Sequence, residues 1–278
     1  MGARLRFGTA GIPHCAPQPT SVSGVAAIRG LGLDAMELQF VQRVSMGHET
    51  ASQVRRAARV AGVSLSVHAP YYINLNSSDP DKLSASRERL LKAARVGAAC
   101  GARDVVFHPA FYHDDAPWLV YRRVRGQLRR ILRQLRTEGV DVCLRPETMG
   151  RPSQFGSLEE VLRLSADLDG VRPCIDFGHL HARSGAVNTY GEFARVLDQV
   201  KQALGQAGLK RMHMHVEGIA YGRAGERKHL VLADSDLCYG ELLQACADWG
   251  VRGTVICESP NLEGDALLLR RAFVELNA

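Results

Sequence analysis

The chain has 278 residues, of which 46% are hydrophobic and 23% charged, and its formal net charge at pH 7 is +6. This is the composition of an ordinary globular protein, and it excludes a low-complexity or disordered chain. No apolar run reaches membrane-spanning length and no apolar signal core follows the N-terminus. The seven cysteines include no C-x-x-C pair, so we expect a cytoplasmic protein in a reducing compartment.

Short apolar segments alternate with amphipathic segments along the chain. The predicted strands span residues 4–8, 35–40, 64–68, 104–108, 141–145, 171–176, 209–215 and 253–258. The predicted helices span residues 21–31, 49–61, 81–100, 120–137, 157–168, 190–207, 235–249 and 264–276. Eight such units predict an α/β fold, a single (β/α)8 TIM barrel that forms one domain over residues 1–278. The alternative is an open doubly wound sheet, but Gly8-Thr-Ala-Gly11 lacks the G-x-G-x-x-G turn that usually follows its first strand.

One segment places a carboxylate and an imidazole where a buried strand ends. Asp176 follows the apolar pair Cys174 and Ile175, and His179 comes three residues later, where it can return to the same side of a turn. Such a pair suits a divalent ion such as zinc. Taken alone, the pair is better explained as an aspartate that caps the next helix with a histidine hydrogen-bonded nearby.

The same residue types recur at the ends of the second to the eighth predicted strands, where the active groups of a parallel barrel collect. They are Glu37, His68, His108, Glu147, Asp176, His179, His213, His215 and Glu258, and Glu226 and His229 follow in the loop after strand seven. So many imidazoles and carboxylates exceed one tetrahedral zinc site. We therefore expect two or three Zn2+ ions bridged by carboxylates, with Mn2+ or Mg2+ as alternatives. Clusters of this kind hydrolyse phosphate esters.

Five motifs carry a family resemblance that covers nearly the whole chain in order. They are His68-Ala-Pro-Tyr-Tyr-Ile-Asn-Leu75, Phe107-His-Pro109, Cys174-Ile-Asp-Phe-Gly-His179, Met212-His213 and Cys257-Glu-Ser-Pro-Asn261. These motifs resemble the endonuclease IV family of apurinic/apyrimidinic endonucleases, part of the wider xylose-isomerase-like barrel superfamily. The resemblance implies a trinuclear zinc site, with ligand roles for His68, His108, Glu147, Asp176, His179, His213 and Glu258.

The resemblance also implies that Tyr71 and Tyr72 occupy a loop that enters DNA at the lesion. Two aromatic residues that only pack a barrel loop would give the same pattern. Between these two interpretations the sequence does not decide.

Three stretches depart from the family pattern and suggest a divergent branch, common in archaea and some thermophilic bacteria. Glu226-Arg-Lys-His229 replaces the family's Asp-Arg-His, so Lys228 stands at a ligand position. We expect His229 to substitute, with Glu226 as its partner on the same ion, because residues three apart share one side of a helical turn. Glu147 is shifted by one position in its motif. In His213-Met-His215, either histidine could be the ligand of strand seven.

The leading hypothesis is a zinc-dependent endonuclease that hydrolyses the phosphodiester 5′ to an abasic site in DNA. Glu147 and Glu258 would be its catalytic carboxylates, and the basic surface would attract DNA. We expect a monomer with no membrane partner. A sugar isomerase or epimerase on the same barrel needs fewer ions and would be satisfied by Glu147, Asp176, His213 and Glu258. A catalytically silent DNA-binding barrel is the third hypothesis, if Lys228 excludes the third ion.

Overall fold

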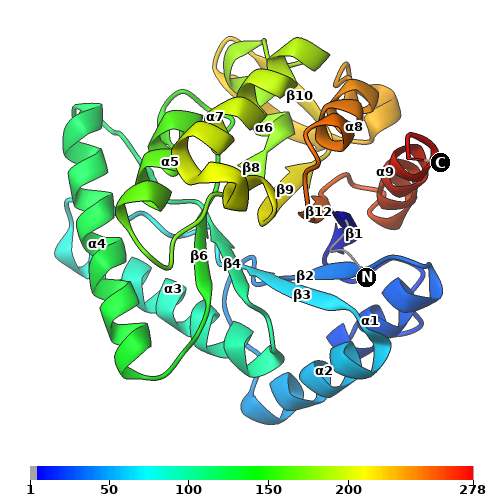
Figure 1. Ribbon diagram of the computed structural model, residues 1–278. Coiled ribbons are helices and arrows are strands. Elements are labelled where there is room, and N and C mark those ends of the chain that lie inside the picture. The colour runs from blue at the N-terminus through cyan, green and yellow to red at the C-terminus, as the bar shows by residue number, and fades with distance from the viewer. Residues whose placement is uncertain (1–4, 278) are drawn as a thin grey trace.

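The computed structural model describes residues 5–277 as a barrel of strands surrounded by helices (Figure 1). The strands of the barrel are β1 (Leu5–Ala10), β2 (Ala35–Gln39), β3 (Ser64–His68), β4 (Asp104–Phe107), β6 (Cys143–Pro146), β8 (Ile175–Asp176), β9 (Met212–Val216) and β12 (Gly253–Cys257). They correspond in order to the eight predicted strands. Arg4, the first residue of the first predicted strand, lies outside the described residues.

The eight strands form one parallel sheet in the order β6-β4-β3-β2-β1-β12-β9-β8. The two ends of this order meet through the residues that precede β8. Leu144 and Val171 form a parallel bridge, and the backbone N–H of Cys174 donates to the carbonyl oxygen of Pro146 over 3.0 Å. The (β/α)8 TIM barrel predicted from the sequence is therefore confirmed.

Eight helices correspond to the predicted ones and pack outside the strands. They are α1 (Ser21–Gly30), α2 (His48–Ala61), α3 (Pro80–Cys100), α4 (Pro117–Thr137), α5 (Leu158–Asp167), α7 (Tyr190–Leu209), α8 (Tyr239–Asp248) and α9 (Glu263–Glu275). Gly62 and Gly101 end α2 and α3 with φ angles of 69° and 84°, a conformation that glycine adopts without steric cost. None of the described helices is long and apolar enough to cross a membrane.

Several short elements in the loops that leave the strands are absent from the predictions. They are helix α6 (Phe177–Ser184), the 3-10 turn η1 (Leu232–Asp234), the pair β5 (Ala110–Phe111) and β7 (Gln154–Phe155), and the hairpin β10 (Gly218–Gly222) and β11 (Gly225–Leu230). Such short elements do not show a clear hydrophobic period. They nevertheless position much of the candidate site.

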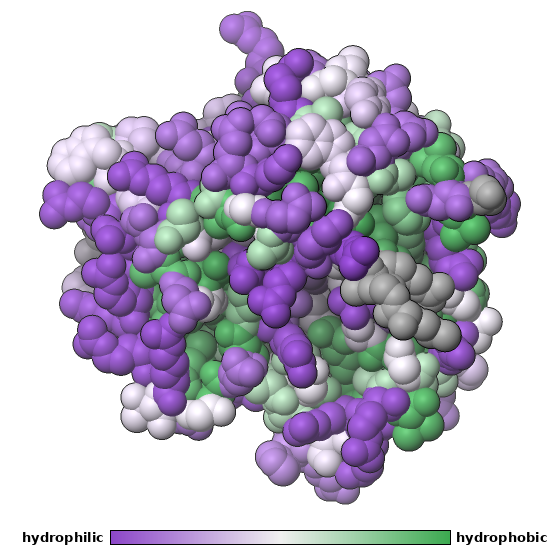
Figure 2. Space-filling view, in the orientation of Figure 1, coloured by the Kyte–Doolittle hydropathy of each residue, from purple (hydrophilic) through white to green (hydrophobic). Residues whose placement is uncertain are grey.

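Alternation along the strands decides which side chains enter the barrel. In β9, Met212, Met214 and Val216 belong to the hydrophobic core between strands and helices. His213 and His215 instead contact carboxylates that belong to other strands and loops of the barrel. A space-filling view shows hydrophilic side chains over the middle of the face presented, with hydrophobic patches among them (Figure 2).

A buried arginine lies at the end of the barrel opposite the carboxyl ends of the strands. Arg145 donates from Nε to Asp104 Oδ1 over 2.6 Å, and from its two terminal nitrogens to the carbonyl oxygens of Pro173 and Arg211. The guanidinium thus joins β4, the segment before β8 and the start of β9. It contributes to a cavity of about 560 Å3 that Arg6 and Arg103 also line.

Substitution of Arg145 tests how much its contacts stabilise the protein. Arg145→Met should lower the free energy of unfolding by about 3 kcal/mol, because Asp104 and two carbonyl groups lose their partner in a mostly buried position. Arg136→Met is the matched control, since Arg136 pairs with the fully exposed Asp169 and should change stability little. Urea unfolding followed by circular dichroism measures both. Equal stability of the two variants would contradict the structural role of Arg145.

Candidate metal centre

The centre is built around the carboxylate of Glu147, which follows β6 directly and is fully buried. Its Oε2 lies 3.2 Å from His68 Nε2 and 3.1 Å from His108 Nε2. Its Oε1 lies 3.1 Å from His215 Nδ1 and 3.4 Å from His179 Nδ1. One carboxylate thus meets four imidazoles from four different strand ends. These residues, all predicted from the sequence as metal ligands, are brought together by the barrel.

His68, His108 and Glu147 form a first group of donor atoms that lie within 4.8 Å of one another. His68 is the last residue of β3, and its Nδ1–H donates to the carbonyl oxygen of Ala69 over 2.9 Å. That hydrogen bond holds the ring so that Nε2 faces Glu147, where it can bind an ion once it has lost its proton. A metal-binding histidine commonly has one nitrogen fixed in this way by a carbonyl group.

Glu147, Asp176, His215 and Glu258 form a second group. Asp176 is the N-cap of α6, and its Oδ1 accepts the backbone N–H of His179 over 2.6 Å. Its other oxygen, Oδ2, is buried without a hydrogen-bond partner and lies 3.9 Å from His215 Nδ1. The capping interpretation and the ligand interpretation of the sequence therefore apply to different oxygens of the same side chain. Asp176 and His179 belong to a strand end and a helix, and not to an open turn as we expected.

His179, Glu226 and His229 form a third group. Glu226 Oε2 lies 3.4 Å from His179 Nε2, and Glu226 Oε1 lies 3.9 Å from His229 Nε2. Lys228 is exposed to solvent.

The local structure behind this third group differs from the expected helical turn. Glu226 and His229 lie on strand β11, where residues three apart would normally point to opposite faces. The pairing with β10 is irregular, because Lys228 pairs with Ala220 but Glu226 pairs with Tyr221. The extra residue, Arg227, is a β-bulge that returns Glu226 and His229 to the same side.

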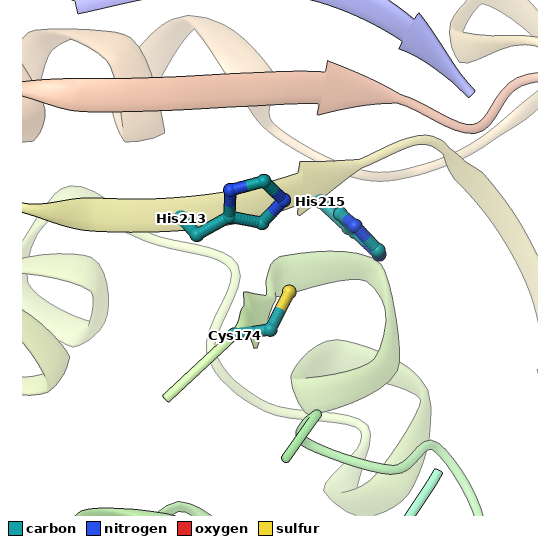
Figure 3. Close-up of side chains that lie close together, drawn as sticks. All are labelled: Cys174, His213 and His215. Atoms are coloured by element: carbon teal, nitrogen blue, oxygen red, sulfur yellow. The ribbon is translucent and has the colours of Figure 1, made fainter. Parts of the chain in front are cut away.

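His213 lies one layer deeper in the barrel than His215. Its Nε2 lies 2.9 Å from Glu37 Oε2, an oxygen that also accepts from Ser66 Oγ over 2.8 Å. His213 and His215 project from the same strand with the thiol of Cys174 nearby (Figure 3). The geometry thus directs His215, and not His213, at the carboxylates of the second group.

Glu37 was named from the sequence among the polar residues at strand ends, but it was not among the ligands that the family resemblance implied. Its Oε1 lies 3.1 Å from His215 Nε2, the nitrogen that faces away from Glu147. A carboxylate behind an imidazole fixes the orientation of the ring and raises its basicity. The available signal was the position of Glu37 in the middle of an otherwise apolar strand.

Unpaired buried atoms at the centre fit divalent ions. Asp176 Oδ2 and His179 Nε2 are buried and have no hydrogen-bond partner among the described residues. Each lies beside an ionisable group, with Asp176 Oδ2 3.3 Å from His179 Nδ1 and His179 Nε2 3.4 Å from Glu226 Oε2. Because neither atom makes a hydrogen bond, both are available to bind an ion. The nitrogen and oxygen donors of these three groups suit zinc or manganese. The residues of the centre therefore fit bound zinc or manganese.

Opposing charges perturb the titration of the centre. Burial opposes the charged form of Glu147, but the adjacent imidazoles, His215 above all, hold its pKa well below the usual range. Burial also opposes charge on His68, yet its hydrogen bond to Glu147 raises its pKa to about 9. Burial raises the pKa of Asp176 to about 6, and His179 offsets this only in part. Without ions, protons therefore occupy several of the donor atoms near neutral pH.

The two tyrosines expected to contact substrate flank the first group. The ring of Tyr71 stacks on His108 with 5.2 Å between ring centroids, and it also contacts His68 at 5.5 Å. Tyr72 makes no ring contact among the described residues and is 64% exposed. Tyr71 therefore packs against the centre, whereas Tyr72 is free to contact a ligand.

Comparison with known proteins places this barrel among its relatives. Residues 25–273 match the family model described as xylose isomerase-like TIM barrel. The chain belongs to this family. It is 42% identical over 273 residues to an uncharacterized protein of Methanocaldococcus jannaschii, with 98% of each chain covered. It is 30% identical to a probable endonuclease 4 of Geobacillus sp., over 54% of this chain and 50% of that one.

Two solved structures show how widely this family's fold is used. Endonuclease IV from Thermus thermophilus is 21% identical and matches with a TM-score of 0.73, over 98% of this chain and 99% of that one. A D-tagatose 3-epimerase-like protein is 18% identical and also matches with a TM-score of 0.73, over 97% of each chain. At these identities the likeness concerns the fold alone. Nucleases and epimerases share it, so the donor groups must be weighed separately.

Metal content distinguishes the two histidines of β9. His215→Ala should remove about one ion per chain, because the second group then loses its only imidazole. His213→Ala should keep the full complement, since its ring contacts Glu37. Elemental analysis of the purified proteins measures both, and far-UV circular dichroism checks folding. Loss of an ion from the His213 variant alone would contradict the assignment.

The affinity for Zn2+ should rise with pH. Below about pH 9 the metal-free His68 carries a proton that an ion must displace. Against the effect of burial, nearby carboxylates also raise the pKa values of His179 and His215, so these rings add further protons, and below about pH 6 Asp176 adds another. Binding should therefore weaken as the pH falls toward 6, more steeply below 6, and should release protons. Calorimetry of the apoprotein in buffers of different ionisation enthalpy measures this release. An affinity independent of pH would show that the donors are already deprotonated.

Proposed function

We propose that this protein is a metal-dependent phosphodiesterase that hydrolyses DNA on the 5′ side of an abasic site. The observation that carries the proposal is the presence of three donor groups joined at one centre, with Glu147 shared by the first and second. Bound divalent ions would activate water and neutralise the charge of a phosphate, the chemistry of clustered metal sites. We infer Zn2+ as the metal, in up to three sites.

The number of imidazoles supports phosphate chemistry over sugar chemistry. Beyond the second group, the chain supplies His68 and His108 on one side and His179 and His229 on the other. If the protein bound a single ion at the second group, these four imidazoles would bind no metal. Several adjacent ions suit a phosphodiester, because an in-line displacement develops charge on both the entering and the leaving oxygen.

The protein residues have separable roles in this proposal. Glu147 holds the first and second groups together, and Glu258, which is slightly exposed, holds the second group on the side of His229. Glu37 orients His215 from below. Tyr71 packs over the imidazoles of the first group and shields them from water, while Tyr72 is available to contact the nucleic acid.

Three arginines of α4 form ion pairs with aspartates and contribute little to the proposed DNA contact. Arg123, Arg125 and Arg136 form ion pairs with Asp115, Asp167 and Asp169. As in other barrels, this helix lies on the outer ring, away from the strand ends. The affinity for DNA would come from the loops around the centre and should fall with salt.

A sugar epimerase is the second candidate, and the second group favours it. Glu147, Asp176, His215 and Glu258 offer three carboxylates and one imidazole, enough for one ion that binds a sugar. The epimerase-like structural neighbour shows that such activity is compatible with this fold. In that case the first and third groups would be dispensable.

Cleavage of a defined duplex tests the proposal. The purified protein should cut a labelled duplex that contains one abasic site and leave a 3′-hydroxyl end, and excess chelator should abolish the reaction. Asp176→Asn should lower the rate by at least about 100-fold, because the second group loses the charge that holds its ion.

The control arm uses an undamaged duplex of the same sequence and a panel of ketoses. Epimerisation of a ketose without cleavage of DNA would favour the second candidate. Tight binding of abasic DNA without cleavage would favour a silent DNA-binding barrel.

Tyr72 provides a test that is specific to nucleic acid. Tyr72→Ala should weaken binding of the abasic duplex by about 1–3 kcal/mol through loss of stacking on a base. Tyr72→Phe should bind like the wild type, and both variants should retain the wild-type metal content. Fluorescence anisotropy with a chelator-inhibited protein measures the affinity. Equal affinity of all three proteins would leave Tyr72 without a role in DNA binding.

A further inference from the structure

Glu217 is a buried carboxylate that the three donor groups described above do not include. It follows the last residue of β9 and has no surface exposed to solvent. Both of its carboxylate oxygens lack a hydrogen-bond partner among the described residues. Burial of an unpaired carboxylate is among the most unfavourable arrangements in a protein, so Glu217 must either carry a proton or bind a compensating cation.

The surroundings of Glu217 are residues of the centre. Its carboxylate lies within 4.8 Å of donor atoms of Asp176 and His179. Asp176 belongs to the second donor group and His179 to the third, so Glu217 lies between them. Its position in the chain supports this location. Residues 213, 215 and 217 lie two apart along β9 and its extension, so their side chains all point toward the interior of the barrel.

The backbone of α6 leaves room for this carboxylate. A Cβ atom on Gly178 would lie only 1.9 Å from Glu217 Oε1. Gly178 sits between Asp176 and His179, so any larger residue there would push Glu217 out of its position. The short helix α6 and its N-cap therefore provide the donors Asp176 and His179, and Gly178 between them leaves room for Glu217.

We propose that Glu217 is a further metal ligand at the boundary between the second and third groups. The inference rests on the proposed metal centre and adds a residue to it. Three divalent ions carry more positive charge than Glu147, Asp176, Glu226 and Glu258 neutralise. An ionised Glu217 supplies a further negative charge in the buried part of the centre, where solvent screens charge weakly.

The decisive variant is Glu217→Gln, which keeps the shape of the side chain and removes its charge. Zn2+ alone is the probe, added to chelator-treated full-length protein. The variant should retain one ion fewer per chain after dialysis, or bind its weakest ion more than about tenfold less tightly than the wild type. A full complement bound within about tenfold of wild-type affinity would overturn the proposal and identify Glu217 as a neutral, protonated neighbour.

Two comparison variants calibrate this result. Glu226→Gln removes the charge of a ligand in the third group and gives the size of effect expected for a genuine ligand. Glu88→Gln makes the same chemical change at an exposed residue of α3, which lies 3.8 Å from the guanidinium of Arg95. It should bind Zn2+ like the wild type.

Glu217→Met separates a ligand from a merely structural residue. Methionine fills a similar volume with no unpaired oxygen, so the melting temperature of the metal-free protein should rise while the number of bound ions falls. A lower melting temperature with unchanged metal content would mean that Glu217 serves packing. If the wild type itself binds no divalent ion, the proposed function fails first. If the wild type binds three and both Glu217 variants do too, only this inference fails.

Discussion

A single buried carboxylate, that of Glu147, constrains the rest of the centre. It lies within 3.4 Å of nitrogens from His68, His108, His179 and His215, which come from four different strand ends. A buried charge is tolerated only where partners satisfy it, so these four rings and their backbone supports must be held in place. Parallel strands provide that support because their carboxyl ends meet at one end of the barrel.

The third donor group depends on irregular local structure more than on the barrel. Arg227 forms a β-bulge in β11, and without it His229 would face away from Glu226. The hairpin is held against the loop after β6, because the backbone N–H of Glu226 donates to the carbonyl oxygen of Gly150 over 3.1 Å. A Cβ on Gly150 would lie 2.7 Å from the Cβ of Glu226, so glycine permits this close approach. Irregular segments of this kind are common next to active sites.

The family relationship settles the architecture and leaves the chemistry to the side chains. Nuclease-like and epimerase-like structures match this barrel equally well, with TM-scores of 0.73. The second group alone would serve one ion, whereas the first and third groups extend it on both sides. The first and third groups add four imidazoles and one carboxylate around this common core, from His68, His108, His179, His229 and Glu226, and our proposal of a nuclease depends on them.

The sequence by itself determined the barrel and most of the residues at its centre. Eight apolar segments of regular spacing can bury their strands only in a few parallel arrangements, and polar residues at the ends of such strands stand out from their apolar surroundings. For the same reason the residues around Glu147 could be named in advance. This reasoning fails where the role of a residue depends on which side chains from other segments contact it.

The choice between His213 and His215 was decided only by the tertiary structure. Both residues are histidines on the same face of β9, and they differ only in their depth along the barrel axis. Glu37 contacts the rings of both histidines, whereas Glu147 and Glu258 contact the ring of His215. The shared side of Glu226 and His229, and the closeness of Glu217 to Asp176, likewise arise from a bulge and a glycine contact. The bulge depends on how β11 pairs with β10, and the glycine contact joins segments that are distant in sequence, so no hydrophobic pattern encodes either.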